Sequence, residues 1–251
     1  MQGGRCGCGK GQNGNQLIKR GIEYTVPRYY TMHCLNGRVL KPELLDTLPP
    51  EEARASLADL VRVNKYWGGY STLRKLVDRV IPPGEAFTIL DVGAASGDMG
   101  RCLREWRPQV QVTCLDYIES HLEGCAGSRV AGDAFALPFA PRSFDYVFSS
   151  LFLHHFTDEQ VVELLAEFGR VARKQVLVID LWRHPVPYYF ISRTRWLFGW
   201  HPVTVYDGAI SVEAAFSPEE LTKLARRAGL AAPQARTFVP AFRIALSAGA
   251  L

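Results

Sequence analysis

Short apolar runs alternate with amphipathic stretches over the last two thirds of the chain. The runs at residues 87–92, 110–115, 144–149 and 175–181 have the length and composition of β-strands. The last of them is almost entirely apolar, as a strand buried on both faces should be. Helical spacing follows the first three runs. This alternation predicts an α/β fold with a doubly wound sheet.

The C-terminal part carries clear start signals for helices. A capping box of Thr157 and Gln160 opens a helix predicted to end near residue 172. Ser217, Pro218 and Glu220 open a final helix that ends near Gly229. The two closing segments are predicted to form a terminal antiparallel hairpin, at residues 234–239 and 241–247.

The region ahead of the first strand predicts a helical cap. Residues 41–80 contain two stretches with one-faced apolar spacing, separated by Gly68 and Gly69. We assign residues 32–83 to this N-terminal cap and residues 84–251 to the main domain. The cap helices either shape a pocket or only cover apolar surface, and the sequence leaves both interpretations open.

A glycine-rich turn, DVGAASG, follows the first strand at residues 91–97. Gly93 and Gly97 allow the bare backbone to approach a ligand closely. The turn lacks the second glycine of the dinucleotide fingerprint G-x-G-x-x-G, and no lysine follows it as in a P-loop. Asp91 would repel a pyrophosphate. The turn therefore favours a cationic ligand.

These residues resemble the first motif of the class I methyltransferases that depend on S-adenosylmethionine (SAM), roughly D/E-x-G-x-G-x-G. Ala95 stands where that motif has its middle glycine. The resemblance covers about residues 81–251. It implies a Rossmann-like fold, SAM as cofactor and S-adenosylhomocysteine as product.

Further landmarks of the family follow in order. Asp116 ends the second strand, 25 residues after Asp91, where the resemblance implies a carboxylate on the ribose, with Tyr117 beside the adenine. The alternative for Asp116 is a helix N-cap. Asp133 and Ala134 would hold the adenine, or else form an ordinary polar turn. The full expected cofactor set is Asp91, Gly93, Ala95, Gly97, Asp116, Tyr117, Asp133, Ala134 and Ser149.

Three histidines are candidates for a catalytic base. His154 and His155 end the strand that begins near residue 144, where the family places residues that face the transferring methyl group, and His184 lies just after the strand at residues 175–181. Histidine suits this role because its unperturbed pKa is about 6.5. Neighbouring residues on a strand point to opposite sides, so only one of the pair is expected in a pocket. A purely structural histidine pair is the alternative.

Residues 182–215 form an aromatic insertion after the strand at residues 175–181. Such density can line a pocket for a flat apolar substrate, pack a dimer interface or contact a membrane surface. We favour the pocket. The candidate substrate-binding residues are Tyr66, Tyr70, Trp182, Tyr188 and Trp196.

Charge and composition limit the remaining possibilities. Residues 1–31 carry the entire net charge of +4, so the main domain does not suggest a nucleic-acid surface. These residues are predicted to be a disordered tail or an extension. No apolar run has the length of a membrane span. The six cysteines show no metal-ligand spacing, and their usage suggests the cytoplasm.

The combined hypothesis is transfer of a methyl group from SAM to a small aromatic or quinone-like acceptor, at a hydroxyl oxygen. Ring C-methylation, as in quinone biosynthesis, is the first alternative. A non-catalytic SAM-binding protein is the second, and an NAD-dependent dehydrogenase is disfavoured by the missing fingerprint. The expected partners are a small molecule and at most one further copy of the chain, with no nucleic acid and no stable membrane insertion.

Overall fold

The computed structural model describes residues 16–19, 22–25, 37–45 and 48–251. Two short strands, β1 (Gln16–Lys19) and β2 (Ile22–Thr25), make up the first two of these segments and pair antiparallel. The tail predicted at residues 1–31 falls mostly outside the described residues and stays a prediction. Residues 35–251 form a separate compact unit.

This larger unit is built on a seven-stranded sheet in the order β5-β4-β3-β6-β7-β9-β8. Five strands run parallel, and β9 is antiparallel to both of its neighbours. The predicted doubly wound α/β fold with a terminal hairpin is therefore confirmed. The strands are β3 (Thr88–Val92), β4 (Gln111–Asp116), β5 (Ser128–Ala131), β6 (Phe144–Ser150), β7 (Ala172–Leu181), β8 (Ala231–Phe238) and β9 (Arg243–Gly249).

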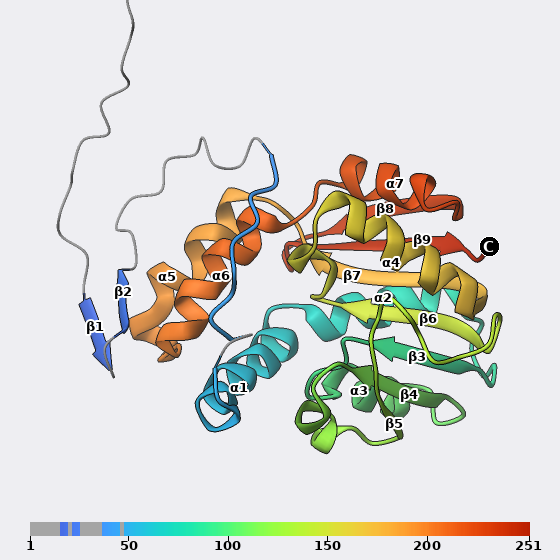
Figure 1. The fold of residues 1–251 in the computed structure, drawn as a ribbon, viewed down its shortest axis with the longest axis horizontal. Helices are drawn as coiled ribbons and strands as arrows, with labels where there is room; N and C mark the ends of the chain where they lie inside the picture. The colour runs from blue at the N-terminus through green and yellow to red at the C-terminus, as the bar shows by residue number, and fades with distance from the viewer. Residues whose placement is uncertain (1–15, 20–21, 26–36, 46–47) are drawn as a thin grey trace, which may run out of the picture. The chain divides into compact units, whose positions relative to one another are not determined.

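Helices cover both faces of the sheet and extend beyond one of its ends (Figure 1). The apolar residues of α2 and α3 pack on one face, and those of α4 and α7 on the other. The helices are α1 (Pro50–Tyr66), α2 (Gly69–Val80), α3 (Asp98–Trp106), α4 (Asp158–Val171), α5 (Pro185–Phe198), α6 (Pro202–Ala214) and α7 (Pro218–Arg227). Two 3₁₀ turns are η3 (Glu119–Gly124) and η4 (Leu153–His155).

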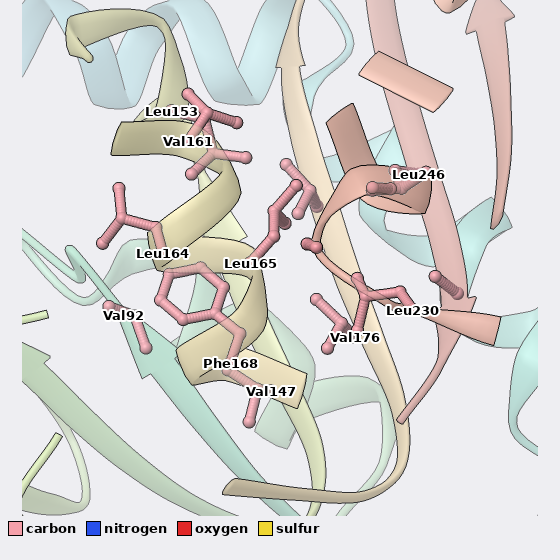
Figure 2. Close-up of a cluster of buried hydrophobic side chains, with 14 of the residues drawn as sticks. Val92, Val147, Leu153, Val161, Leu164, Leu165, Phe168, Val176, Leu230 and Leu246 are labelled. Carbon is pink, nitrogen blue, oxygen red and sulfur yellow. The ribbon is translucent and has the colours of Figure 1, made fainter. Parts of the chain in front are cut away.

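The two-fold periodicity of the central strands divides the core into two layers. On β7, Val176 and Val178 face α4, whereas Leu177 and Ile179 face the layer of α2 and α3. Figure 2 shows the first layer, in which Phe168 of α4 lies beside Val147. A parallel sheet covered on both faces leaves its strand ends for function.

Local signals fix where the helices begin. Both capping boxes predicted from the sequence are present, at Thr157 with Gln160 and at Ser217 with Glu220. The aromatic insertion at residues 182–215 is folded into α5 and α6. Among the described residues, no helix combines the length and apolarity that crossing a bilayer requires.

Truncation of Phe168 tests the core assignment. This side chain is fully buried, so Phe168→Ala should lower the free energy of unfolding by about 3–5 kcal/mol. Trp196→Ala is the control because Trp196 is 79% exposed, and its cost should stay below about 0.5 kcal/mol. Urea denaturation measures both values. Equal losses for the two variants would contradict the layer assignment.

Candidate functional site

A cavity of about 760 Å³ lies at the carboxyl ends of the parallel strands. Its walls come from the turn after β3, the ends of β4 and β7, η4, and the overlying helices α1, α5 and α6. This is the position in which open α/β sheets bind ligands. The volume lies in the range of small-molecule sites.

The turn after β3 approaches the cavity through bare backbone. Gly93 has a φ of 69°, and a Cβ there would lie 2.5 Å from the ring of Phe152. Ala95 also adopts a positive φ, 43°, which costs a residue with a Cβ more than it costs glycine. Both residues line the cavity. Ala95 therefore keeps the backbone conformation for which a glycine would be better suited.

Asp116 marks one end of the cavity. Its carboxylate accepts hydrogen bonds from the backbone N–H of Ala95 (3.0 Å) and of Ile118 (3.0 Å), which ties the β3 turn to the end of β4. Burial raises the pKa of Asp116, but the hydrogen bond from His121 and those from the backbone hold it below its usual value. Asp116 is thus a fixed carboxylate, and Tyr117 lines the cavity beside it.

Other members of the expected cofactor set do not line the cavity. Asp91 and Ser149 are buried, and each has a side-chain oxygen without a hydrogen-bond partner among the described residues. Burial, and then the charge of Asp98, raise the pKa of Asp91. Gly97 packs against Cys125, so that a Cβ on Gly97 would lie 2.4 Å from the sulfur of Cys125. Direct ligand contacts by these residues, and by Asp133 and Ala134, stay predictions.

The opposite end of the cavity holds a buried ionic cluster. His154 Nδ1 lies 2.7 Å from Asp180 on β7, and His154 Nε2 lies 3.4 Å from Glu43. The ring of His155 stacks on that of His154 with centroids 4.4 Å apart. Glu43, His154 and His155 all line the cavity.

Both adjacent histidines face the cavity, which differs from the strand-based expectation. The strand β6 ends at Ser150, and the histidines lie in the 3₁₀ turn η4. Alternation of side chains does not apply to such a turn, so the two rings can lie on the same side.

Glu43 reaches this cluster from a segment far away in the sequence. The carboxylate of Asp207 on α6 accepts hydrogen bonds from the backbone N–H of Leu44 (2.9 Å) and Leu45 (3.0 Å). Ser211, also on α6, donates a hydrogen bond to Glu43. The α6 helix therefore holds the segment so that Glu43 faces His154.

The carboxylates set the charge of His154. Burial lowers its pKa, but the charges and hydrogen bonds of Asp180 and Glu43 outweigh this effect and raise the pKa to about 10. His154 is therefore an imidazolium near neutral pH. It cannot accept a proton there, but it can stabilise a negative charge beside it.

The cluster also has the composition of a metal site. Glu43, His154 and His155 each place one potential ligand atom within 4.8 Å of the others. However, both ring nitrogens of His154 already face carboxylates, and a protonated ring offers no lone pair to a metal ion. The observed contacts describe a hydrogen-bonded ionic cluster.

His184 has a different place from the other two candidates. It is the N-cap of α5, and its Nδ1 accepts a hydrogen bond from the backbone N–H of Val186 (3.1 Å). It does not line the cavity. Its geometry supports a structural role.

The aromatic wall of the cavity consists of residues other than the five expected. Tyr66 and Trp196 are exposed, Trp182 stacks on Phe242, and the hydroxyl of buried Tyr188 donates to Glu213. None of these four, nor Tyr70, lines the cavity. The aromatic residues that do line it, besides Tyr117, are Trp67, Phe152, Phe156, Phe190 and Phe242.

Sequence reasoning also missed two charged residues at the cavity. Glu43 lies in a short polar segment with no recognisable motif. Arg243 is a single basic residue within the apolar stretch of the last strand, and no motif marks it. Both become visible once the β7–β9 pairing and the α6 contacts bring them to one end of the sheet.

Comparison with known proteins agrees with this geometry. The sequence model of a methyltransferase domain family matches residues 89–175, which include the glycine turn, Asp116 and the histidine pair. Residues 89–175 thus match a methyltransferase domain, and the chain is similar to class I SAM-dependent methyltransferases. SAM is the cofactor of the methyltransferases that the chain resembles.

Two curated relatives illustrate the likeness to this methyltransferase domain. A demethylmenaquinone methyltransferase of Roseiflexus castenholzii is 29% identical over 51% of this chain and 60% of its own length. The ubiquinone/menaquinone biosynthesis C-methyltransferase UbiE of Paracoccus denitrificans is 33% identical over 49% and 54%. The chain thus spans less than two thirds of the length of either relative.

A solved structure supports the fold alone. Magnesium protoporphyrin IX methyltransferase of Synechocystis PCC 6803 superposes with a TM-score of 0.52 at 14% identity. The match covers 73% of this chain and 84% of that protein.

The charge of His154 gives the methyltransferase domain a pH-dependent stability. A folded-state pKa of about 10 lies above the unfolded value, so the stabilisation is complete below about pH 6.5 and is lost as the pH rises through 10. The titratable and charged groups around His154 are Asp180, Glu43, His155 and, beyond Asp180, Arg243. Between pH 7 and 9 the free energy of unfolding should fall by up to about 1.4 kcal/mol per pH unit.

Glu43→Gln removes one of the two carboxylates that raise the pKa of His154. The decline in the free energy of unfolding with rising pH should therefore end at a lower pH than in the unmodified protein. Glu159→Gln is the control, because that exposed carboxylate lies outside the cluster. Denaturant melts across the pH range measure the three profiles. A Glu43→Gln profile equal to that of the unmodified protein would contradict the assigned charge of His154.

Proposed function

We propose that the protein transfers the methyl group of SAM to a small, flat acceptor that carries a hydroxyl group. The observation that carries this proposal is one cavity lined by Asp116 and the β3 turn on the β4 side of the sheet and by the histidine cluster on the β6–β7 side. A cofactor and an acceptor bound at these two ends would meet between them.

The cofactor end supports the binding of SAM by a carboxylate and backbone. Asp116 accepts from the backbone N–H groups of Ala95 and Ile118 and from His121, so about one of its four acceptor positions remains for a ribose hydroxyl. Exposed Tyr117 can lie against the adenine. The turn at Gly93, which lies against the ring of Phe152, would then hold the methionine part of SAM.

The acceptor end combines an apolar wall with a polar floor. Trp67, Phe190 and Phe242 supply flat surfaces for a ring, and α1 contributes aliphatic side chains. Such a lining excludes water and orients the acceptor. The polar floor is the cluster of Glu43, His154 and His155, which is suited to a hydroxyl group.

The reaction itself is an in-line displacement. The acceptor oxygen forms a bond to the methyl carbon, the carbon–sulfur bond breaks, and its electron pair stays on the sulfur of S-adenosylhomocysteine. His155 takes the hydroxyl proton and passes it to solvent. The imidazolium of His154 stabilises the developing oxyanion, a role that its raised pKa supports.

Ring C-methylation is the second candidate, favoured by the names of the two relatives. Deprotonation of a ring hydroxyl also makes the adjacent ring carbon nucleophilic, so the same cluster serves both reactions. Transfer from SAM with a ¹³C-labelled methyl group separates them, because aryl ethers and ring methyl groups have different ¹³C chemical shifts. Binding of SAM without any transfer would leave the non-catalytic alternative.

Partners and location remain predictions. Val186, Trp196 and Leu197 expose apolar surface on α5, which is compatible with a homodimer or with peripheral contact to a membrane. The cytoplasmic location rests on cysteine usage alone.

Asp116→Asn tests the cofactor end. Loss of a charged acceptor for the ribose should weaken the binding of S-adenosylhomocysteine about 10- to 100-fold, as expected for a hydrogen bond to a charged group. Isothermal titration calorimetry measures the affinity, with Glu159→Gln as an exposed carboxylate control. Unchanged affinity of a folded Asp116→Asn protein would refute the ribose assignment.

Replacement of single histidines tests the acceptor end. His155→Gln should lower kcat about 10²- to 10⁴-fold, the usual contribution of a general base, and rate should be regained with acceptors of lower pKa. His184→Gln should leave kcat within a few-fold because His184 caps α5 outside the cavity. The reverse ranking of the two variants would transfer the base role to His184.

A further inference from the structure

Arg243 is a buried cation at the acceptor end of the cavity. It begins β9 and pairs with Leu181 at the carboxyl end of β7. Its exposed fraction is 3%, yet it lines the cavity. Among the residues that the structure describes, its Nε has no hydrogen-bond partner, and no carboxylate lies within ion-pair distance of it.

A buried guanidinium without partners is costly. It carries five N–H donors and a charge, and each needs compensation when removed from water. Burial lowers the pKa of Arg243 to about 10, even though the charge of Asp180 opposes this shift. The group remains charged at neutral pH, so the cost of burying its charge is not avoided by loss of the proton.

Asp180 does not satisfy Arg243. Its two carboxylate oxygens already accept from the ring of His154 (2.7 Å), the backbone N–H of His154 (3.3 Å) and that of Leu181 (2.7 Å). Asp180 therefore leaves the guanidinium unpaired, and the Arg243 side chain, which lines the cavity, can donate to a molecule that enters it.

We propose that Arg243 binds a carboxylate of the acceptor, so that the substrate class is hydroxylated aromatic acids. This inference rests on the proposed function and specifies its substrate. A planar two-oxygen anion matches the fork of a guanidinium, which can donate two parallel hydrogen bonds to it.

The surroundings of Arg243 fit an aromatic acid. Phe242, the preceding residue, lines the cavity and stacks on Trp182 with an interplanar angle of 19°. The acceptor ring can lie against this flat surface while its carboxylate meets Arg243. The histidine cluster, linked to the same Asp180, then receives the hydroxyl group at another position of the ring.

SAM also carries a carboxylate, but the strand order places Arg243 far from its site. β6 and β7 separate β9 from β3, so three strand spacings, or about 14 Å, lie between Arg243 and the strand that leads into the cofactor turn. The shared chemistry is a carboxylate, and the experiment below distinguishes its two sources.

The test compares matched probes on matched variants. 3-Hydroxybenzoate and 4-hydroxybenzoate are titrated against their neutral amides in the presence of saturating S-adenosylhomocysteine. Arg243→Met removes the charge but keeps a long, unbranched side chain. Arg243→Lys keeps the charge but lacks the two parallel N–H donors of a guanidinium. At least one hydroxybenzoate should bind the unmodified protein at least 10-fold more tightly than its amide. Arg243→Met should abolish this preference, and Arg243→Lys should retain part of it.

Two further readouts separate binding from structure. Arg243→Met should leave S-adenosylhomocysteine affinity unchanged. It should also raise the melting temperature of the ligand-free protein, because an uncompensated buried charge has been removed. A structural role would lower that temperature instead.

Three results would overturn the proposal. The first is the absence of any carboxylate preference in the unmodified protein, and the second is a preference that survives in Arg243→Met. The third is a loss of S-adenosylhomocysteine affinity equal to the loss for the acid, which would assign Arg243 to the cofactor. Failure of the proposed function is distinct, since it would appear as a preserved carboxylate preference without methyl transfer to any probe.

Discussion

An imidazolium held between two buried carboxylates determines the arrangement of the acceptor end. His154 joins Asp180 of β7 to Glu43, which lies ahead of every helix of the cap. Burial of such a cluster is unfavourable unless all members are paired, so the loss of one partner leaves an uncompensated charge on the others. The pairing therefore fixes η4, the end of β7 and the segment at residues 43–45 relative to one another. The polar floor of the cavity exists because these three parts of the chain meet there.

The two ends of the cavity are built on different principles. At the cofactor end, Gly93 and Ala95 in left-handed conformations present backbone, and Asp116 is held by two N–H groups. At the acceptor end, charged side chains are fixed by other side chains, and the Nε of Arg243 is left without a hydrogen-bond partner among the described residues. Backbone groups are thus suited to bind the cofactor that the whole class shares, and such contacts tolerate changes of side chain. The acceptor is met by individual side chains, which can differ between relatives of similar fold.

The same distinction explains what the sequence could predict. Strand and helix positions followed from apolar periodicity and capping boxes, and the placement of Gly93 and Asp116 followed from their positions after β3 and β4. The substrate residues could not be read in this way. Tyr66 and Trp196 are aromatic residues on helices of the cap and the insertion, and which helical face turns inward depends on how α1, α5 and α6 pack together. Glu43 depends on a contact with α6 across more than 160 residues, for which no local pattern exists. The histidine pair was located correctly but was interpreted with strand geometry, whereas η4 is a 3₁₀ turn.

The central claim is that the methyl group of SAM is presented to the histidine cluster inside this cavity. Nuclear Overhauser measurements with SAM carrying a ¹³C-labelled S-methyl group test it most directly. The protein is deuterated except for its histidine rings, which keep ¹H on carbon. The account predicts cross-peaks from the labelled methyl to the ring of His155, and their loss in His155→Gln. Cross-peaks to His184 instead, or a bound methyl group without contact to any histidine ring, would contradict it.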